Sequence, residues 1–165
     1  MGMDVSGINP KNEVGEYFRA NCWSWRPIKT LVDVACQRYE QRENKTLLDK
    51  KTLSSMNHND GAGAEDQETC DLLAAEMEAV LADEQMKTEL LTDGCLIVDD
   101  SEIKWPTSVT PDCLVNANGT FVNTKELLTM TAEQKTKLHS PYSTDREHVA
   151  EFIRFLRACG GFEVH

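Results

Sequence analysis

No part of this 165-residue chain contains the ~20 consecutive apolar residues that a membrane-spanning helix requires. The first ten residues, MGMDVSGINP, also lack the basic region and the following apolar region of a secretory signal peptide. We therefore expect a cytoplasmic protein that has no membrane partner.

Cysteine spacings that bind zinc or carry redox chemistry are missing as well. No two of the six cysteines lie within four residues of each other, which excludes CxxC motifs. Because there is no export signal, we interpret all six as reduced thiols that pack as small apolar side chains. They are Cys22, Cys36, Cys70, Cys95, Cys113 and Cys159.

Signatures of catalysis are absent too. HExxH, GxSxG and SxxK do not occur, and the four histidines show no zinc spacing. We predict a non-enzymatic protein with no catalytic residue, no cofactor and no metal site. An enzyme that uses Cys22, His58 or Asp60 ranks third among the functions considered, since the partners of a Cys–His dyad need only meet in space.

Basic residues are almost absent from one segment. Residues 59–102 contain fourteen Asp and Glu against a single base, Lys87, which gives a charge of −13 in a chain whose total is −11. The rest of the chain carries fourteen acids and sixteen bases. Direct nucleic-acid binding is therefore not expected, because it needs clustered Lys and Arg.

Apolar residues with helical spacing predict three amphipathic helices, from Pro27 to about Arg42, from about Glu68 to Leu91, and from a capping box of Thr144 with Glu147. Their expected buried residues are Ile28, Leu31, Val32, Ala35, Cys36 and Tyr39, then Cys70, Leu73, Ala74, Met77, Val80 and Leu81, then Val149, Phe152, Ile153 and Leu156. Gly160 stands where a glycine after a helix end is expected.

Short strands are predicted at 3–5, 95–98 and 162–164, with a hairpin over 113–122 and a short helix over 131–138. The fold class is α+β, with about three amphipathic helices packed on a small, mostly antiparallel sheet. We expect residues 1–165 to form a single compact domain. The long connection at about 43–68, with a helical fragment near 46–53, is of a length that is usually functional or mobile.

Four segments, MGMDVSGINP, GEYFRANCWSWRP, NDGAG and FIRFLRACGGFEV, follow one another in this order. Together they resemble a group of small uncharacterised proteins encoded by bacteriophages and prophages. The resemblance covers about the first third of the chain and the last fifteen residues, and the acidic segment is not part of it. It implies a phage or prophage origin and a location in the host cytoplasm. It transfers no catalytic residues, because the group has no established activity.

The segment GEYFRANCWSWRP concentrates four of the eleven aromatic residues of the chain. Tryptophan and arginine together suit the clamping of a planar anion such as a nucleotide, or the anchoring of a protein interface. The favoured interpretation is structural: alternate aromatic side chains enter the core and an arginine packs across a ring. The residues concerned are Tyr17, Phe18, Arg19, Trp23, Trp25 and Arg26.

The segment NDGAG is interpreted as a surface turn. Backbone N–H groups in such a turn suit a phosphate, but the Lys-Ser/Thr pair of a P-loop is missing and the acids that follow would repel the ligand. His58 and Asp60 lack the ordered spacing of a cation-binding loop.

Our leading hypothesis is a phage-type accessory protein that binds a host or defence protein with a basic surface. In this hypothesis the acidic surface mimics the charge of a nucleic acid. The alternative explanation of the acidic segment is a solvated helix face with no partner. The predicted partner-binding residues are Trp23, Trp25, Arg26, Glu65, Asp66, Glu68, Asp71, Glu76, Glu78, Asp83 and Glu84.

The alternative is a protein that binds or sequesters a small anionic, nucleotide-like ligand. Here the aromatic segment faces the NDGAG turn around the ligand. The predicted ligand-binding residues are Arg19, Trp23, Trp25, Arg26, Asn59, Asp60, Gly61 and Gly63.

Overall fold

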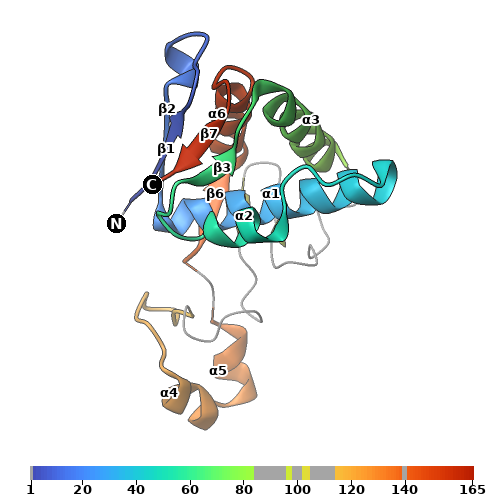
Figure 1. Ribbon diagram of the computed structural model, residues 1–165. Coiled ribbons are helices and arrows are strands. Elements are labelled where there is room, and N and C mark those ends of the chain that lie inside the picture. Colours follow the sequence, from blue (N-terminus) through green and yellow to red (C-terminus); the bar gives the residue numbers. More distant parts are fainter. Residues whose placement is uncertain (1, 84–95, 98–101, 105–113, 139–140) are drawn as a thin grey trace.

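The computed structural model describes residues 2–83, 96–97, 102–104, 114–138 and 141–165, and it confirms the α+β class (Figure 1). Its elements in chain order are β1 (Gly2–Gly7), the 3-10 helix η1 (Glu13–Gly15), β2 (Tyr17–Asn21), α1 (Cys22–Glu43), α2 (Lys50–Ser55), β3 (Ala62–Ala64), α3 (Gln67–Ala82), β4 (Leu96–Ile97), β5 (Glu102–Lys104), α4 (Thr124–Thr129), α5 (Ala132–Thr136), β6 (Ser143–Asp145), α6 (Arg146–Leu156) and β7 (Phe162–Val164).

The main sheet has the strand order β2-β1-β7-β3 and is antiparallel throughout. Val5 in β1 is in register with Phe18 on one side and with Val164 on the other. The two ends of the chain are joined here, because Asp4 and His165 exchange backbone hydrogen bonds of 2.9 and 2.7 Å. A second sheet, β4-β5-β6, leads directly into α6.

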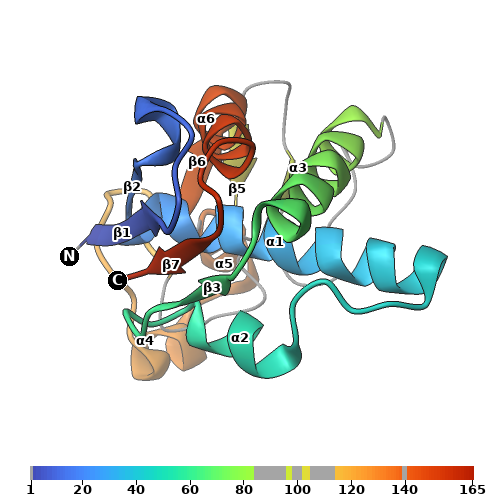
Figure 2. The ribbon, with the colours of Figure 1, turned by 45° about the horizontal axis from the view of Figure 1, so that its top comes forward.

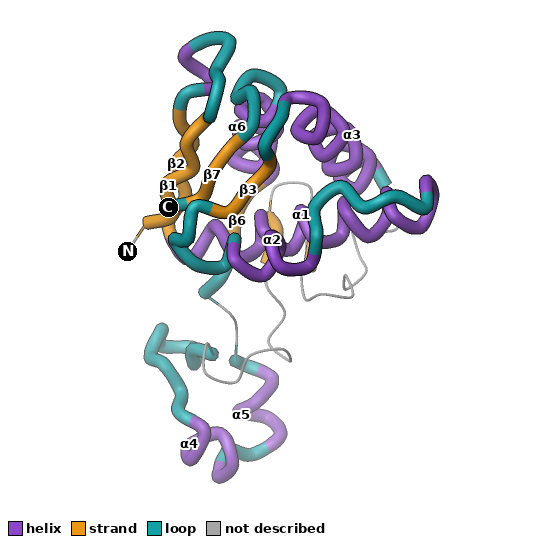
Figure 3. The backbone as a smooth tube through the Cα atoms, viewed as in Figure 1, coloured by secondary structure: helices purple, strands orange, loops and turns teal. Residues whose placement is uncertain are grey.

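Helices α1, α3 and α6 cover one face of the main sheet (Figures 1 and 2). The strand residues alternate between buried and exposed, as expected for a sheet with one covered face. All the residues predicted for the three apolar faces are buried except Tyr39 and Leu81, which are partly exposed. The helical spacing therefore predicted the core correctly. Helices α4 and α5 lie apart from this core (Figure 3), and the residues around them form a separate small apolar cluster of Leu114, Val122 and Leu138.

Helix α1 begins at Cys22, five residues before the predicted start at Pro27. The Asn21 side chain caps it by accepting hydrogen bonds from the backbone N–H groups of Trp23 and Ser24, at 3.0 and 2.9 Å. Pro27 consequently lies inside the helix near its beginning, where it removes one backbone hydrogen bond. The helix ends at Glu43, close to the predicted Arg42.

The predicted connection at 43–68 contains regular structure. It includes the short helix α2 and the strand β3, which pairs with β7 at the edge of the main sheet. The interpretation of NDGAG as only a turn is therefore wrong for its second half. Gly63 allows β3 to approach β7 closely, since a Cβ at this position would lie 1.9 Å from the backbone oxygen of Phe162.

One further helix boundary differs from the predictions, and another agrees as far as it is described. Helix α3 begins at Gln67 and is described to Ala82, so the predicted extension to Leu91 lies outside the described residues. Helix α6 is capped by Asp145 rather than Thr144, because the Asp145 carboxylate accepts from the backbone N–H of His148 while Thr144 belongs to β6. Gly160 has a φ of +65°, but it lies in the turn before β7.

The smaller elements follow the predictions more closely. The capping box of Thr131 and Gln134 opens α5, and Val115 pairs with Phe121 in a small hairpin. Cys113 lies outside the described residues, as do residues 95 and 98 of the predicted strand at 95–98. Within the described part of the chain, no helix combines the length and the apolar character needed to cross a membrane.

Candidate ligand cleft at the start of helix α1

The aromatic segment divides between the core and the surface. Phe18 and Trp25 are buried, with Trp25 only 2% exposed, whereas Tyr17 and Trp23 are 50% and 38% exposed. The Arg26 guanidinium lies over the Tyr142 ring, 4.4 Å from its centroid. The interpretation that alternate aromatic side chains enter the core while an arginine packs across a ring is thus confirmed.

Trp25 connects the start of α1 to the chain that follows α2. Its indole Nε1 donates a hydrogen bond of 2.9 Å to the backbone carbonyl of Met56, which is itself fully buried. The ring meets Phe152 of α6 edge-on, with 5.7 Å between centroids. These contacts hold residues 57–59 beside the first turns of α1.

A cleft of about 670 Å³ lies between these two segments. None of the described residues that line it is acidic, although the chain contains 28 Asp and Glu. Its polar groups are a guanidinium, an imidazole, two carboxamides and a partly exposed thiol. The lining residues are Met3, Cys22, Trp25, Arg26, Asn57, His58 and Asn59.

Of the predicted ligand-binding residues, only Trp25, Arg26 and Asn59 line the cleft. Arg19 is exposed on β2 and does not line it, and neither does Trp23, so the prediction that these two side chains face NDGAG around one ligand is wrong. The outward direction of both follows from the alternation along β2 and from the helical turn that begins at Cys22.

The glycines and the aspartate of NDGAG are also outside the lining. Asp60 is exposed, Gly61 turns the chain with a φ of +72°, and Gly63 lies in β3 against the backbone of Phe162. A backbone cradle for phosphate is therefore not formed by this segment, because its second half is engaged in strand pairing.

Cys22 and His58, which were not among the predicted ligand-binding residues, do line the cleft. Met3 and Asn57 were not predicted. Met3 belongs to the buried face of β1, and Asn57 enters the cleft because of the hydrogen bond between Trp25 and Met56. No sequence motif marks that long-range contact.

The acidic residues of α3 are largely engaged within the fold. Glu76 is 5% exposed and forms an ion pair with Arg42, so its prediction as a surface charge presented to a partner is wrong. Glu78 pairs with Arg157 at 2.7 Å and Asp83 with Arg38 at 3.4 Å. These pairs form because α3 packs against α1, which carries Arg38 and Arg42, and against α6, whose C-cap residue is Arg157.

At the start of α3, Asp66 caps the helix and Asp71 accepts a hydrogen bond from Gln67. Glu65, Asp66 and Glu68 are exposed, and Glu84 lies outside the described residues. Among the described acids that were predicted to bind a partner, the exposed ones without an ion pair are therefore those at 65–68.

Trp23 forms a surface stack with the hairpin that precedes α4. Its ring lies 5.9 Å from the ring of Phe121, which is 53% exposed, and 5.0 Å from that of Tyr142. This exposed aromatic pair was not predicted, because Phe121 is distant in sequence and its hairpin carries no sign of the contact.

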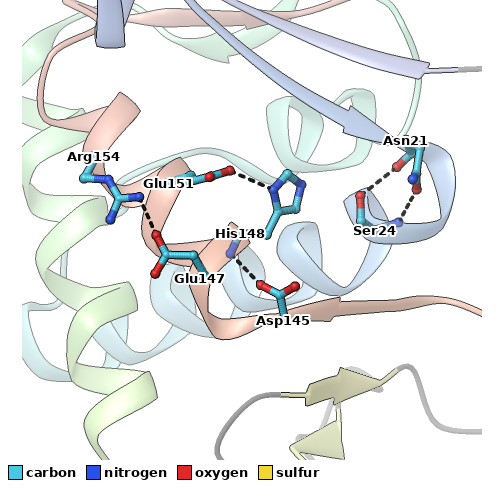
Figure 4. Close-up of polar contacts among 7 residues, drawn as sticks. All are labelled: Asn21, Ser24, Asp145, Glu147, His148, Glu151 and Arg154. Atoms are coloured by element: carbon cyan, nitrogen blue, oxygen red, sulfur yellow. Dashed lines mark hydrogen bonds and ion pairs between the residues drawn. The ribbon is translucent and has the colours of Figure 1, made fainter.

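A second, more polar cleft of about 480 Å³ lies at the start of α6 (Figure 4). Its carboxylates have partners: Asp145 caps α6, Glu147 pairs with Arg154 at 2.8 Å, and Glu151 lies 3.1 Å from Nδ1 of His148. Among the residues that the structure describes, no cluster of three or more His, Cys, Asp or Glu is arranged to hold a metal ion. This cleft is best explained by the capping and pairing of α6.

No protein-family model matches the chain, and neither does any curated protein or solved structure with which it was compared.

Proposed function

We propose that the protein binds a small anion with a planar group, such as a nucleotide, in the cleft at the start of α1. The observation that carries the proposal is the juxtaposition of Arg26 with Asn57, His58 and Asn59, in a lining whose described residues include no carboxylate. In a protein of charge −11, these lining residues place a positive charge, and none of the opposite sign, beside a bound anion.

Arg26 supplies the charge for this ligand. A guanidinium binds phosphate or carboxylate through paired N–H donors, and its contact with the Tyr142 ring restricts its orientation before the ligand arrives. The carboxamides of Asn57 and Asn59 both donate and accept hydrogen bonds, which suits the polar edge of a base. Trp25 and Met3 add an apolar wall against which a planar group packs.

The experiment has two stages. Native mass spectrometry of the protein, purified gently and without added ligand, first reports any bound small molecule. Melting temperatures are then measured with mononucleotides, nucleosides and inorganic phosphate. We expect at least one mononucleotide to raise Tm, by an amount that grows with its concentration above Kd.

Arg26→Ala is expected to abolish that rise in Tm. The matched control is Arg19→Ala, which removes an exposed arginine of β2 that does not line the cleft and leaves the rise unchanged. An equal rise in the Arg26→Ala protein, or no rise with any compound in wild type, contradicts the proposal.

A second candidate function, binding of a host or defence protein with a basic surface, is favoured by the exposed stack of Trp23 and Phe121. Aromatic side chains of this kind are enriched in the energetic centres of interfaces. The exposed acids at 65–68 would contribute steering of a basic partner.

This candidate is tested by affinity capture from host lysate, with Trp23→Ala and a Glu65→Lys/Glu68→Lys double variant beside wild type. We expect the first to lose the captured protein and the second to weaken capture at low salt. Capture that survives both changes argues against this interface.

A further inference from the structure

The sulfur atoms of Cys70 and Cys159 are in contact. They lie 3.6 Å apart, although the two residues are separated by 89 positions in the sequence, and both residues are fully buried. Cys70 is in the first turn of α3, and Cys159 is in the turn between α6 and β7. A disulfide bond of about 2.05 Å requires the two sulfurs to approach each other by a further ~1.5 Å.

The backbone on both sides of Cys159 is fixed to α3 by one side chain. The carboxamide of Gln67 donates to the carbonyl of Leu156 and accepts from the backbone N–H of Gly160, both at 2.8 Å. Gln67 stands one helical turn before Cys70 on α3. The turn is also held from its other side, where the N–H of Asn9 donates to the Cys159 carbonyl at 3.1 Å.

We propose that Cys70 and Cys159 form a reversible disulfide that responds to hydroperoxides. A thiolate attacks the peroxide oxygen and becomes a sulfenic acid as hydroxide leaves. The second thiol then displaces the sulfenic oxygen as water, so that two thiols and one hydrogen peroxide give one disulfide and two waters. A small dithiol such as dithiothreitol reverses the reaction by thiol–disulfide exchange.

The two thiols are suited to different parts in this reaction. The hydrogen bond between them lowers the pKa of Cys159, and the backbone N–H of Gly161 acts in the same direction, whereas burial opposes it. The same hydrogen bond and burial raise the pKa of Cys70. Cys159 is therefore the more acidic thiol of the pair, which favours it for the first step, and Cys70 for the second.

The consequence is a covalent link between α3 and the turn that leads into β7. It closes a long loop, which restricts the unfolded chain, and it joins elements that already pack together. Oxidation is thus expected to stabilise the protein rather than to unfold it. The inference is independent of any ligand in the cleft.

The test is treatment of the full-length protein with hydrogen peroxide, followed by digestion without reduction and peptide mass mapping. We expect one cross-linked pair containing Cys70 and Cys159, with the loss of two hydrogen atoms. We also expect a rise in Tm of about 5–10 °C that dithiothreitol reverses.

Cys70→Ala and Cys159→Ala are each expected to lose the rise in Tm, while Cys36→Ser, a change at another buried cysteine, keeps it. If a variant does not fold, the peptide map of wild type decides alone. Sulfinic acid at Cys159 without a cross-link, cross-links that involve other cysteines, or a lower Tm in the cross-linked protein each overturn the proposal.

Discussion

The Nε1 atom of Trp25 donates a hydrogen bond to the backbone carbonyl of Met56, 2.9 Å away, and so joins the first turns of α1 to the chain after α2. Both residues are buried, so neither partner has water as an alternative. This one bond sets the position of residues 57–59, and with it one wall of the cleft.

Trp25→Phe is expected to lower the free energy of unfolding by about 2–4 kcal/mol, because it leaves a buried carbonyl without a donor and also removes volume from the core. Urea unfolding monitored by circular dichroism measures the change. Trp23→Phe is the control, since Trp23 is partly exposed, and its cost is expected to be below ~1 kcal/mol. Equal effects of the two substitutions would show that the Met56 contact adds nothing.

Gly63→Ala is expected to destabilise the protein by more than about 2 kcal/mol, because the added Cβ meets the backbone of Phe162 and separates β3 from β7. Gly119→Ala provides the comparison. Gly119 has a φ of +78° but open space around its Cα, so only conformational strain of about 1 kcal/mol is expected. Thermal unfolding of both variants separates steric contact from strain, and a Gly63→Ala protein as stable as wild type contradicts the described pairing.

Removal of the positive partner of Glu76 is expected to destabilise the protein more than removal of both members of the pair. Arg42 donates to the buried Glu76 carboxylate, a hydrogen bond that raises the pKa of Arg42. Arg42→Met is expected to lower the urea midpoint, and the further change Glu76→Met to restore it in part. Arg154→Met, which breaks an exposed pair with Glu147, should leave the midpoint nearly unchanged.

Alkaline pH is expected to destabilise the protein through Cys36. Burial raises the pKa of its thiol from 9.0 to about 12, so between these values the unfolded chain releases a proton that the folded chain keeps. Stability from this group is complete below pH 9 and falls, by at most ~1.4 kcal/mol per pH unit, until the folded thiol ionises near pH 12. Urea midpoints between pH 8 and 11 should therefore fall less steeply with pH in Cys36→Ala than in wild type. An identical pH dependence in the two proteins would contradict the raised pKa of Cys36.

The amphipathic helices were predictable because their buried faces repeat with the helical period, as in Val149, Phe152 and Ile153 of α6. The start of α1 was not predictable in this way. Proline is common at the first position of a helix, so Pro27 indicated a later start than the one that Asn21 sets by capping the helix. Strand β3 was hidden for another reason. Ala62, Gly63 and Ala64 have little strand preference of their own, and they become a strand through pairing with β7.

The candidate site was predictable in part. Trp25 and Arg26 were identified by their residue types, and Asn59 by its place in a turn-forming segment. The remaining lining depends on a hydrogen bond across 31 positions, which no local pattern encodes. The burial of Glu76 was similarly hidden, because a charged residue on an amphipathic helix does not reveal which neighbour covers it.

The most direct test of the cleft is the rate at which Cys22 is alkylated by iodoacetamide, followed by peptide mass mapping, with and without mononucleotides. Cys22 lines the cleft and is partly exposed, whereas Cys36, Cys70 and Cys159 are buried. A mononucleotide at ten times its Kd is expected to slow this reaction about tenfold in wild type and not at all in Arg26→Ala. An unchanged rate at Cys22 with a nucleotide that raises Tm would place the ligand elsewhere and contradict the proposed site.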